Sequence, residues 1–300
     1  MAILERPKSA LPAKLRGLHL FHYGGAPCAQ RVRFALAEKG IRRGPDVAWR
    51  SAAPEHLEAA PGTYIGRPVS LPRQENLTED YAAIHPNLVV PALVHDGVLH
   101  IESVDIIDYI DGELPGPALV PTGEDGDRCR ALVQRAAELQ RSVRYVTYRW
   151  SLGGIAKLSA KKQQEVQRLD SPDSPDQLAD FYRRFSNGEI SEEAFAEHVS
   201  RLGEGFTEVE RLLGDERSWL CGAEFSMADV LWAVKVVRIS EAGYPFATAF
   251  PRLQAWFDRV RARPTFQEAI GGDLGVASKF LRARGAVQNL LGRGLQQLAT

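Results

Sequence analysis

Cys28 is the residue of this sequence with the clearest capacity for chemistry. It stands in the stretch GGAPCAQRVRFALAEKG (24–40), after a short apolar run and at the expected start of a helix. Unpaired N–H groups and the helix dipole favour negative charge at such a place, so a thiol there could act as a thiolate or stabilise another anion. The alternative is that Cys28 packs beneath the helix with Val32 and Leu36 as a small apolar side chain.

A second candidate pair, Glu102 and Ser103, follows the β-rich stretch PALVHDGVLHI (91–101). A carboxylate and a hydroxyl at the first turn of a helix could hold the ammonium and carboxylate groups of a ligand. Both residue types also favour helix starts without any ligand, so capping remains the alternative.

A third group, Arg141, Tyr145 and Tyr148, shares one side of a long helical pattern. Tyrosine rings combine apolar area with a polar end, which is what an aromatic ligand requires. A role at the surface or in a subunit interface is the alternative. The seven histidines are scattered without ligand spacing, and we predict no metal site.

The elements that must position these residues follow from periodicity and turn signals. The order is β-α-β-α-β-β-α, with a hairpin around Asp96-Gly97 and a short helix capped by Thr78. The stretch 51–72, rich in Ala, Pro and Gly, is predicted to be a long loop. The other predicted elements are strands at 18–23 and 46–50, a helix at 27–39 and a helix over 102–114.

The rest of the chain is predicted to be helical, with a polar excursion at 159–190 and a basic tail that could form an amphipathic helix. Ser226 and Asp229 form a capping-box-like pair at the start of an apolar central helix. The predicted organisation is a flexible arm (1–16), an α/β domain (17–114), a linker (115–126), an all-helical domain (127–270) and a C-terminal tail (271–300).

Composition narrows the possible functions. The net charge of −1 argues against a nucleic-acid binder, and no stretch approaches the length of an apolar membrane span. The three cysteines are widely spaced and contain no CxxC pair, so neither a disulfide framework nor a zinc site is expected. The chain also begins without the long apolar segment of a signal peptide, and a cytoplasmic location is the prediction.

Four stretches in the same order resemble the soluble glutathione transferase family. PCAQRVRFALAEKG is similar to the zeta-class segment, and HPNLVVPALVHDGVLHIESVDIIDYI to the stretch running from Asn-Pro through Val-Pro to Glu-Ser. SMADV resembles the capping box of the family's helical core, and FPRLQAWFDRVRARPTF its closing helix. The chain looks most like the tetrachlorohydroquinone reductive dehalogenases and the β-aryl etherases.

The resemblance implies a thioredoxin-like glutathione-binding domain at 17–114 and a substrate domain at 127–270. Glu102 and Ser103 would hold the γ-glutamyl group, and Val90 would pair with the cysteinyl backbone beside a cis Pro91. His85 is a further candidate glutathione contact, at the glycine end, with Arg31 and residues 73–80 as the alternatives. For the second substrate, the face that holds Arg141, Tyr145 and Tyr148, with Arg149 as a further candidate, is the predicted site, and a homodimer is expected.

For Cys28 the resemblance implies either a hydrogen bond to the glutathione sulfur or attack on a glutathione conjugate. The zeta-class serines fall at Ala26 and Pro27, so no hydroxyl is present there. We therefore predict a glutathione-dependent enzyme acting on an electrophilic, aromatic substrate by aryl ether cleavage or dehalogenation. A zeta-like isomerase and a non-catalytic binding module of the same fold are the alternatives.

Overall fold

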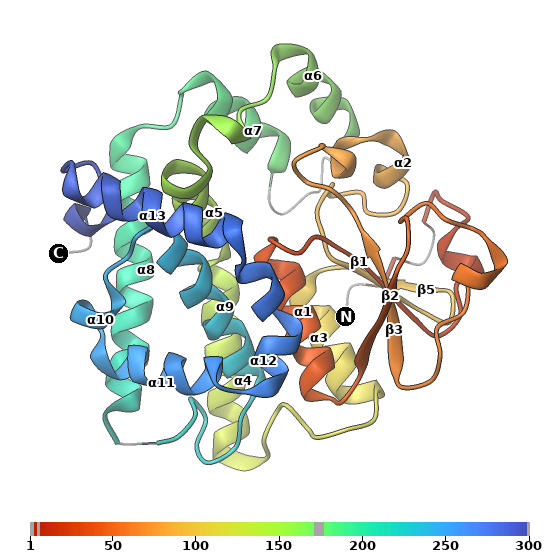
Figure 1. Cartoon of the computed structure of the whole chain (residues 1–300), viewed down its shortest axis with the longest axis horizontal. Helices are drawn as coiled ribbons and strands as arrows, with labels where there is room; N and C mark the ends of the chain where they lie inside the picture. The colour runs from red at the N-terminus through yellow and green to blue at the C-terminus, as the bar shows by residue number, and fades with distance from the viewer. Residues whose placement is uncertain (1–2, 5–6, 171–176, 216, 299–300) are drawn as a thin grey trace. The chain divides into compact units, whose positions relative to one another are not determined.

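The computed structural model describes residues 3–4, 7–170, 177–215 and 217–298. The chain forms two compact units, coloured along the sequence in Figure 1. The first comprises Met1–Pro117 and Leu158–Arg184, and the second comprises Ala118–Lys157 and Phe185–Thr300. The boundary between Pro117 and Ala118 lies inside the predicted linker. None of the helices in the described ranges is long and apolar enough to cross a membrane.

The first unit is built on a five-stranded mixed sheet of the thioredoxin-like type. Its strand order is β2-β3-β1-β4-β5, with β1 parallel to β3 and antiparallel to β4. The hairpin predicted around Asp96-Gly97 joins β4 to β5, with both residues at positive φ. The strands are β1 (Leu18–His22), β2 (Arg42–Asp46), β3 (Thr63–Pro68), β4 (Ala92–His95) and β5 (Val98–His100).

Two predictions for the middle of this sheet are wrong. The second strand is Arg42–Asp46 rather than 46–50, and Thr63–Pro68 is a strand inside the stretch predicted to be a loop. β2 is a largely exposed edge strand, so it lacks an apolar pattern. β3 contains Gly66 and Pro68, residues that usually signal a loop, although it pairs along its length with the buried β1.

Arg67, on β3, shows why that strand is difficult to recognise from sequence. Its side chain is fully buried, and its guanidinium donates to the carbonyl oxygens of Trp49, Ser51 and His56 at 3.2, 2.9 and 2.6 Å. Its Nε also donates to Nδ1 of His19 at 3.2 Å. The charged residue therefore holds the loop 49–56 against the sheet from inside.

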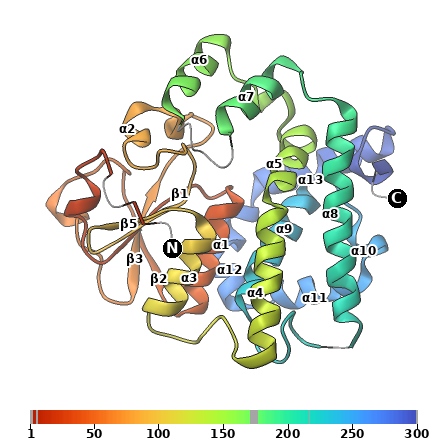
Figure 2. The same cartoon turned by 180° about the vertical axis from the view of Figure 1, so that it is seen from behind.

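Two helices, α1 (Pro27–Glu38) and α3 (Ser103–Glu113), pack side by side in the first unit (Figure 2). Pro27 occupies the first position of α1, and Gly40, with a φ of 77°, follows the end of that helix. The short α2 (Glu79–Ala82) is capped by the Thr78 hydroxyl, which accepts from Tyr81 N. The predictions for these three helices are confirmed.

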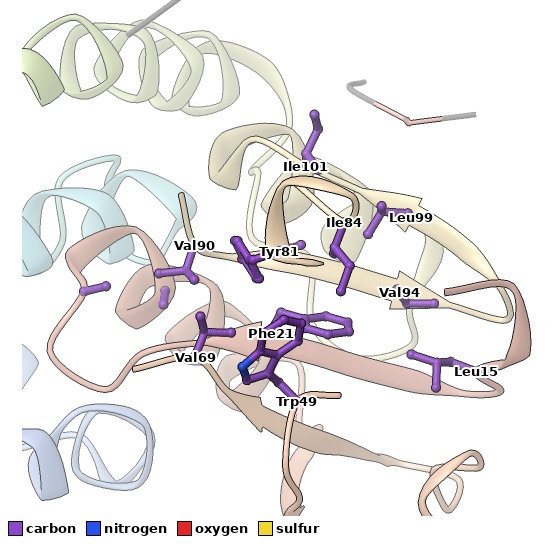
Figure 3. Packing of buried hydrophobic residues seen from close by; sticks show 13 residues of the cluster. Leu15, Phe21, Trp49, Val69, Tyr81, Ile84, Val90, Val94, Leu99 and Ile101 are labelled. Carbon is purple, nitrogen blue, oxygen red and sulfur yellow. The ribbon is translucent and has the colours of Figure 1, made fainter. Parts of the chain in front are cut away.

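The main core of this unit joins the sheet to α1 and α2. Figure 3 shows Phe21, Trp49 and Tyr81 at the centre of the cluster, with Val69 and Val90 together at one end. The rings of Trp49 and Tyr81 meet edge to face at 5.5 Å between centroids. Ala26 and Ala29 of the α1 start belong to the same cluster, so Val90 and the α1 start are parts of one packed core.

The excursion after residue 157 belongs to the first unit as far as Arg184, and the chain from Phe185 onward belongs to the second unit. The excursion contains α6 (Ala160–Leu169) and α7 (Leu178–Asn187), and α6 lies beside the α2 region in both views (Figures 1 and 2). Its apolar residues form a separate cluster with two residues near α2, namely Leu77, Leu88, Leu158, Val166 and Leu178. The predicted helical domain therefore does not hold the whole of 127–270.

The second unit is helical, and α9 (Met227–Glu241) is buried on nearly every side. The capping box is present: Asp229 Oδ2 accepts from Ser226 N and Oγ, and Oδ1 accepts from Leu220 N and Trp256 Nε1. The other helices are α4 (Gly123–Glu138), α5 (Gln140–Val146), α8 (Glu192–Leu212), α10 (Phe246–Ala249), α11 (Pro251–Arg261), α12 (Pro264–Ala269) and α13 (Val276–Leu290), with a π-helical turn at Thr147–Leu152.

Candidate active site

Cys28 is the second residue of α1 and a partly exposed free thiol. Ala26 takes the N-cap position with extended backbone (φ −88°, ψ 120°), and its N–H donates to Tyr23 O at 3.1 Å. The turn thus ends the strand and begins the helix within four residues. The sulfur lies in the first turn, where the positive end of the helix dipole favours an anion.

Arg31 provides a fixed positive charge at this sulfur. Its Nη2 donates to Cys28 Sγ at 3.1 Å, while the side chain as a whole is only 5% exposed. Its Nε is buried and has no hydrogen-bond partner within the described residues. Because a guanidinium does not lose its proton in a protein, Arg31 favours a thiolate at Cys28 or another sulfur anion beside it.

The loop that precedes β4 is held rigidly from behind. Asn76 Nδ2 donates to Leu88 O at 2.7 Å, and the buried Tyr81 hydroxyl donates to Val89 O at 2.9 Å. Leu88 has a φ of 57°, a conformation that costs a residue other than glycine free energy unless its surroundings hold it. The two side-chain bonds and the buried Leu88 side chain provide that hold.

Val90, at the end of this loop, could bind a ligand through its backbone N–H and C=O groups. The Val90-Pro91 bond is cis, as predicted. Within the part of the chain that the structure describes, neither N–H nor C=O of Val90 forms a hydrogen bond. A peptide-like ligand lying antiparallel to Val90 could therefore supply both partners.

Glu102 lies at the N-cap of α3 with φ 62° and ψ 110°. Such a conformation costs on the order of 1–3 kcal/mol for a side chain other than glycine, and it is typical of functional sites. Its Oε1 accepts from Asn87 Nδ2 at 3.0 Å, which links α3 to the loop before Pro91. Ser103 follows as the buried first residue of α3. A carboxylate held at a helix start suits a ligand ammonium.

His85 is placed differently from the prediction. Its side chain is fully buried, and its Nδ1 accepts from Asn87 N at 3.3 Å. Burial lowers its pKa to about 4, so the ring is neutral at physiological pH. An enclosed neutral ring cannot touch a ligand at the surface, and we reassign His85 to support of the loop that carries Asn87.

The three residues of the predicted substrate face, Arg141, Tyr145 and Tyr148, differ in how far they are buried. Tyr145 is buried, with its ring 3.9 Å from His198 and 6.0 Å from Phe195 between centroids, so it packs between α5 and α8. Arg141 is exposed, and its guanidinium lies 5.8 Å from the Tyr145 ring. Tyr148 is half-buried and meets Phe185 edge to face at 5.3 Å. Tyr145 is therefore a core residue, which leaves Tyr148 as the aromatic candidate.

Comparison with known proteins identifies the family. A model of the glutathione S-transferase N-terminal domain matches residues 20–118, and a model of the C-terminal domain matches 192–259, together more than half of the chain. The chain belongs to the glutathione S-transferase family. Its cosubstrate is accordingly glutathione.

Three similar proteins illustrate the range of this glutathione S-transferase's relatives. Glutathione S-transferase Z2 of Arabidopsis thaliana is 25% identical, covering 84% of this chain and 90% of its own length. The 2,5-dichlorohydroquinone reductive dechlorinase of Sphingobium indicum is 27% identical, covering 84% and 81%. Among solved structures, the β-etherase LigF from Sphingobium sp. strain SYK-6 aligns with a TM-score of 0.69 at 23% identity, covering 85% of this chain and 99% of LigF.

The residues of the site fit this cosubstrate. Val90 has free peptide groups, Glu102 a carboxylate at a helix start, and Arg31 a buried cation beside the thiol. From the sequence, Arg31 is a candidate only for the glycine end of glutathione, and its pairing with Cys28 was missed. The signal was present, since residues three apart share a helix face. Asn76 and Tyr81 left no such signal, because their partners are backbone carbonyl groups 12 and 8 residues further along the chain, beyond a helical turn.

Proposed function

We propose that this transferase uses the glutathione thiolate to displace a halide or an aryl ether oxygen from an aromatic electrophile. The observation that carries the proposal is the pairing of Cys28 with Arg31 at the start of α1. Ala26 and Pro27 provide no hydroxyl, so the sulfur chemistry depends on this pair and on the helix dipole. The names of two relatives, a reductive dechlorinase and a β-etherase, describe the same reaction classes.

In the displacement step, the glutathione sulfur attacks the carbon that bears the leaving group. A carbon–sulfur bond forms, and the halide or aryloxide departs with the bonding electron pair. Glu102 and Ser103 hold the γ-glutamyl end, and the Val90 peptide groups hold the cysteinyl backbone. Arg31 stabilises the attacking thiolate before the bond forms.

For reductive dehalogenation, a second step removes the sulfur again. The Cys28 thiolate attacks the sulfur of the glutathione conjugate, a sulfur–sulfur bond forms, and the aromatic carbon takes the electron pair and a proton. A second glutathione thiolate then attacks the mixed disulfide and releases oxidised glutathione together with the Cys28 thiolate. Two glutathione molecules thus supply the two electrons that replace the halogen by hydrogen.

A zeta-like isomerase is the second candidate, favoured by the similarity to glutathione S-transferase Z2. Isomerisation needs a glutathione adduct but no cysteine nucleophile. The missing hydroxyls at 26 and 27 argue against it. A binding module without catalysis is the third, and the intact Glu102–Asn87 and Val90 arrangement argues against that. A cytoplasmic location and a homodimer stay predictions of the proposal.

The deciding experiment compares the wild type with Cys28→Ser and Cys28→Ala on three substrates: a β-aryl ether, a halogenated hydroquinone and a maleyl compound. Dehalogenation should stop in both variants, with a glutathione conjugate accumulating, whereas ether cleavage should be slowed but retained. Mass spectrometry should find one glutathione on Cys28 during dehalogenation. Unchanged turnover of every substrate would rule out a role for Cys28, and failure to bind glutathione in calorimetry would rule out the enzyme itself.

A further inference from the structure

The C-terminal helix α13 docks on the second unit through one face. A side chain at Gly285 would lie 3.0 Å from the Gly243 backbone, so the two glycines allow the closest approach. Asn289 Nδ2 donates to Gly243 O at 2.8 Å, and Arg284 Nη1 donates to Ser151 O at 3.2 Å. These contacts fix the rotation of the helix about its axis.

The side of the helix that faces away from Gly285 and Asn289 carries an apolar stripe, defined as Phe280, Val287, Leu290 and Leu291. These side chains are 62%, 53%, 87% and 67% exposed. Spacings of seven and four residues place Phe280, Val287 and Leu291 along one side of a helix. Single exposed apolar residues are common, but several aligned on one helix mark a contact surface.

The charges around the apolar stripe have one sign. From Leu274 to Leu298 the sequence holds four basic residues and no acidic one. Arg284 is used in docking, while Lys279 and Arg293 are exposed near the two ends of the stripe and Arg282 is half-buried. The surface is therefore apolar along its middle and positive at its margins.

We propose that α13 binds an anionic lipid surface, with the apolar stripe inserted among the acyl chains. Lys279 and Arg293 would lie at the level of the headgroup phosphates. An exposed apolar stripe flanked by basic residues is the composition of helices that lie in a membrane interface without crossing it. The inference does not depend on the reaction that the enzyme catalyses.

A second copy of this chain fits the surface less well. In a two-fold contact the same surface meets itself, so Lys279 and Arg293 of one copy would face basic residues of the other. Like charges opposed across an interface disfavour association. A bilayer containing phosphatidylserine presents the complementary charge instead.

The test is sedimentation of the full chain with vesicles of phosphatidylcholine alone and of phosphatidylcholine mixed with phosphatidylserine. Binding is expected to the mixed vesicles and to fall at high salt, because added ions screen the attraction. Lys279→Gln with Arg293→Gln should weaken binding roughly 25-fold, about five-fold for each charge. Phe280→Ser with Leu291→Ser should abolish it.

Two matched controls and a melting curve for every variant keep the test specific. Lys161→Gln removes an exposed basic residue on α6, and Val98→Ser removes an exposed apolar one on β5. Both should bind mixed vesicles as the wild type does. No binding to mixed vesicles, or equal binding by folded stripe variants, overturns the proposal. So does light scattering that shows the stripe variants dissociating a dimer while vesicle binding is unchanged.

Discussion

At the scale of single residues, the site depends on one cation placed beside one sulfur. Arg31 is buried, and the only described partner of its guanidinium is the Cys28 sulfur at 3.1 Å. A hydrogen bond to a charged group is worth about 1.5–3 kcal/mol, more than a bond between neutral groups. Arg31 is therefore the side chain whose removal should change the reactivity of Cys28 most directly.

Replacing Arg31 by Gln should slow alkylation of Cys28 by iodoacetamide at neutral pH by roughly 10- to 100-fold, the equivalent of the lost charge-assisted bond. Arg31→Lys keeps the charge without the planar guanidinium group, and its alkylation rate should lie between those of the wild type and Arg31→Gln. The alkylated residue is identified by mass spectrometry, with Cys28→Ser as the blank. Equal rates in all three proteins would show that the cation does not act on the sulfur.

Glu102→Gln should weaken glutathione binding by about 1.5–3 kcal/mol in calorimetry, because the amide no longer pairs as an anion with the ligand ammonium. The Asn87 contact survives, since the amide oxygen still accepts from Nδ2. Glu79→Gln, an exposed change at the start of α2, is the control and should bind normally. Unaltered binding by Glu102→Gln would leave this carboxylate with a capping role alone.

Single residues were predicted unevenly, for physical reasons. Cys28, Glu102 and Ser103 stand next to strand ends and helix starts, which periodicity locates well. His85 and Tyr145 were misplaced because histidine and tyrosine occur both in sites and in cores, and the sequence does not reveal burial. His85 is hydrogen-bonded to Asn87, and Tyr145 packs against side chains of α8.

At the scale of elements, the exposed edge strand β2 carries an ion pair of its own, between Arg43 and Asp46, close to the buried His22 of β1. His22 and then Arg43 hold the pKa of Asp46 at about 2, below its usual 3.8. His22 Nε2 lies 3.8 Å from Asp46 Oδ1, and Arg43 Nη2 lies 2.6 Å from Oδ2. A side chain at Gly66 would overlap the Asp46 carboxylate, so β3 needs glycine there.

This arrangement predicts an acid-sensitive part of the stability. A carboxyl whose pKa is depressed in the folded state stabilises the fold above its unfolded pKa, and that contribution is lost as the pH falls through 3.8 toward 2. Asp46→Asn should flatten this limb of the urea-unfolding profile and leave the profile above pH 5 parallel to that of the wild type. Asp80→Asn, an exposed change, serves as the control, and an acid limb unchanged by Asp46→Asn would contradict the assignment.

The capping box of α9 makes a second prediction at this scale. Asp229 accepts four hydrogen bonds in a fully buried position, and its removal leaves several donors unpaired. Asp229→Ala should lower the free energy of unfolding by at least about 3 kcal/mol in urea, because each buried donor left unpaired costs about 1–3 kcal/mol. Asp258→Ala, on an exposed part of α11, should change it by less than about 0.5 kcal/mol. A small loss for Asp229→Ala would mean that water replaces the carboxylate.

At the scale of the whole molecule, the chain forms two units, and the first of them is assembled from two separate stretches of sequence. The linker was predicted from its prolines and glycines, and the unit boundary falls within it. The return of residues 158–184 to the first unit was not predicted. Its apolar residues are few and widely spaced, and their partners Leu77 and Leu88 lie some 70–100 positions earlier, a pairing that local patterns do not contain.

A fragment ending at Pro117 should therefore expose Leu77 and Leu88, which are 1% and 0% exposed in the chain. It should bind more of the dye ANS and unfold at lower urea than the first unit does in the full protein. Full-length Leu178→Ala is the comparison, with an expected loss of about 2–5 kcal/mol. A fragment as stable as the intact unit, with no dye binding, would show that the returning segment adds nothing.

The return of residues 158–184 also has a consequence for synthesis on the ribosome. The chain emerges from its N-terminus, so the sheet, α1 and the loop before Pro91 appear long before Leu158, Val166 and Leu178 do. The first unit cannot close over Leu88 until more than half of the polypeptide has been made. A nascent chain paused before residue 158 leaves the apolar surface around Leu77 and Leu88 open to chaperones. The rate of translation between residues 118 and 158 then determines how long this surface remains exposed.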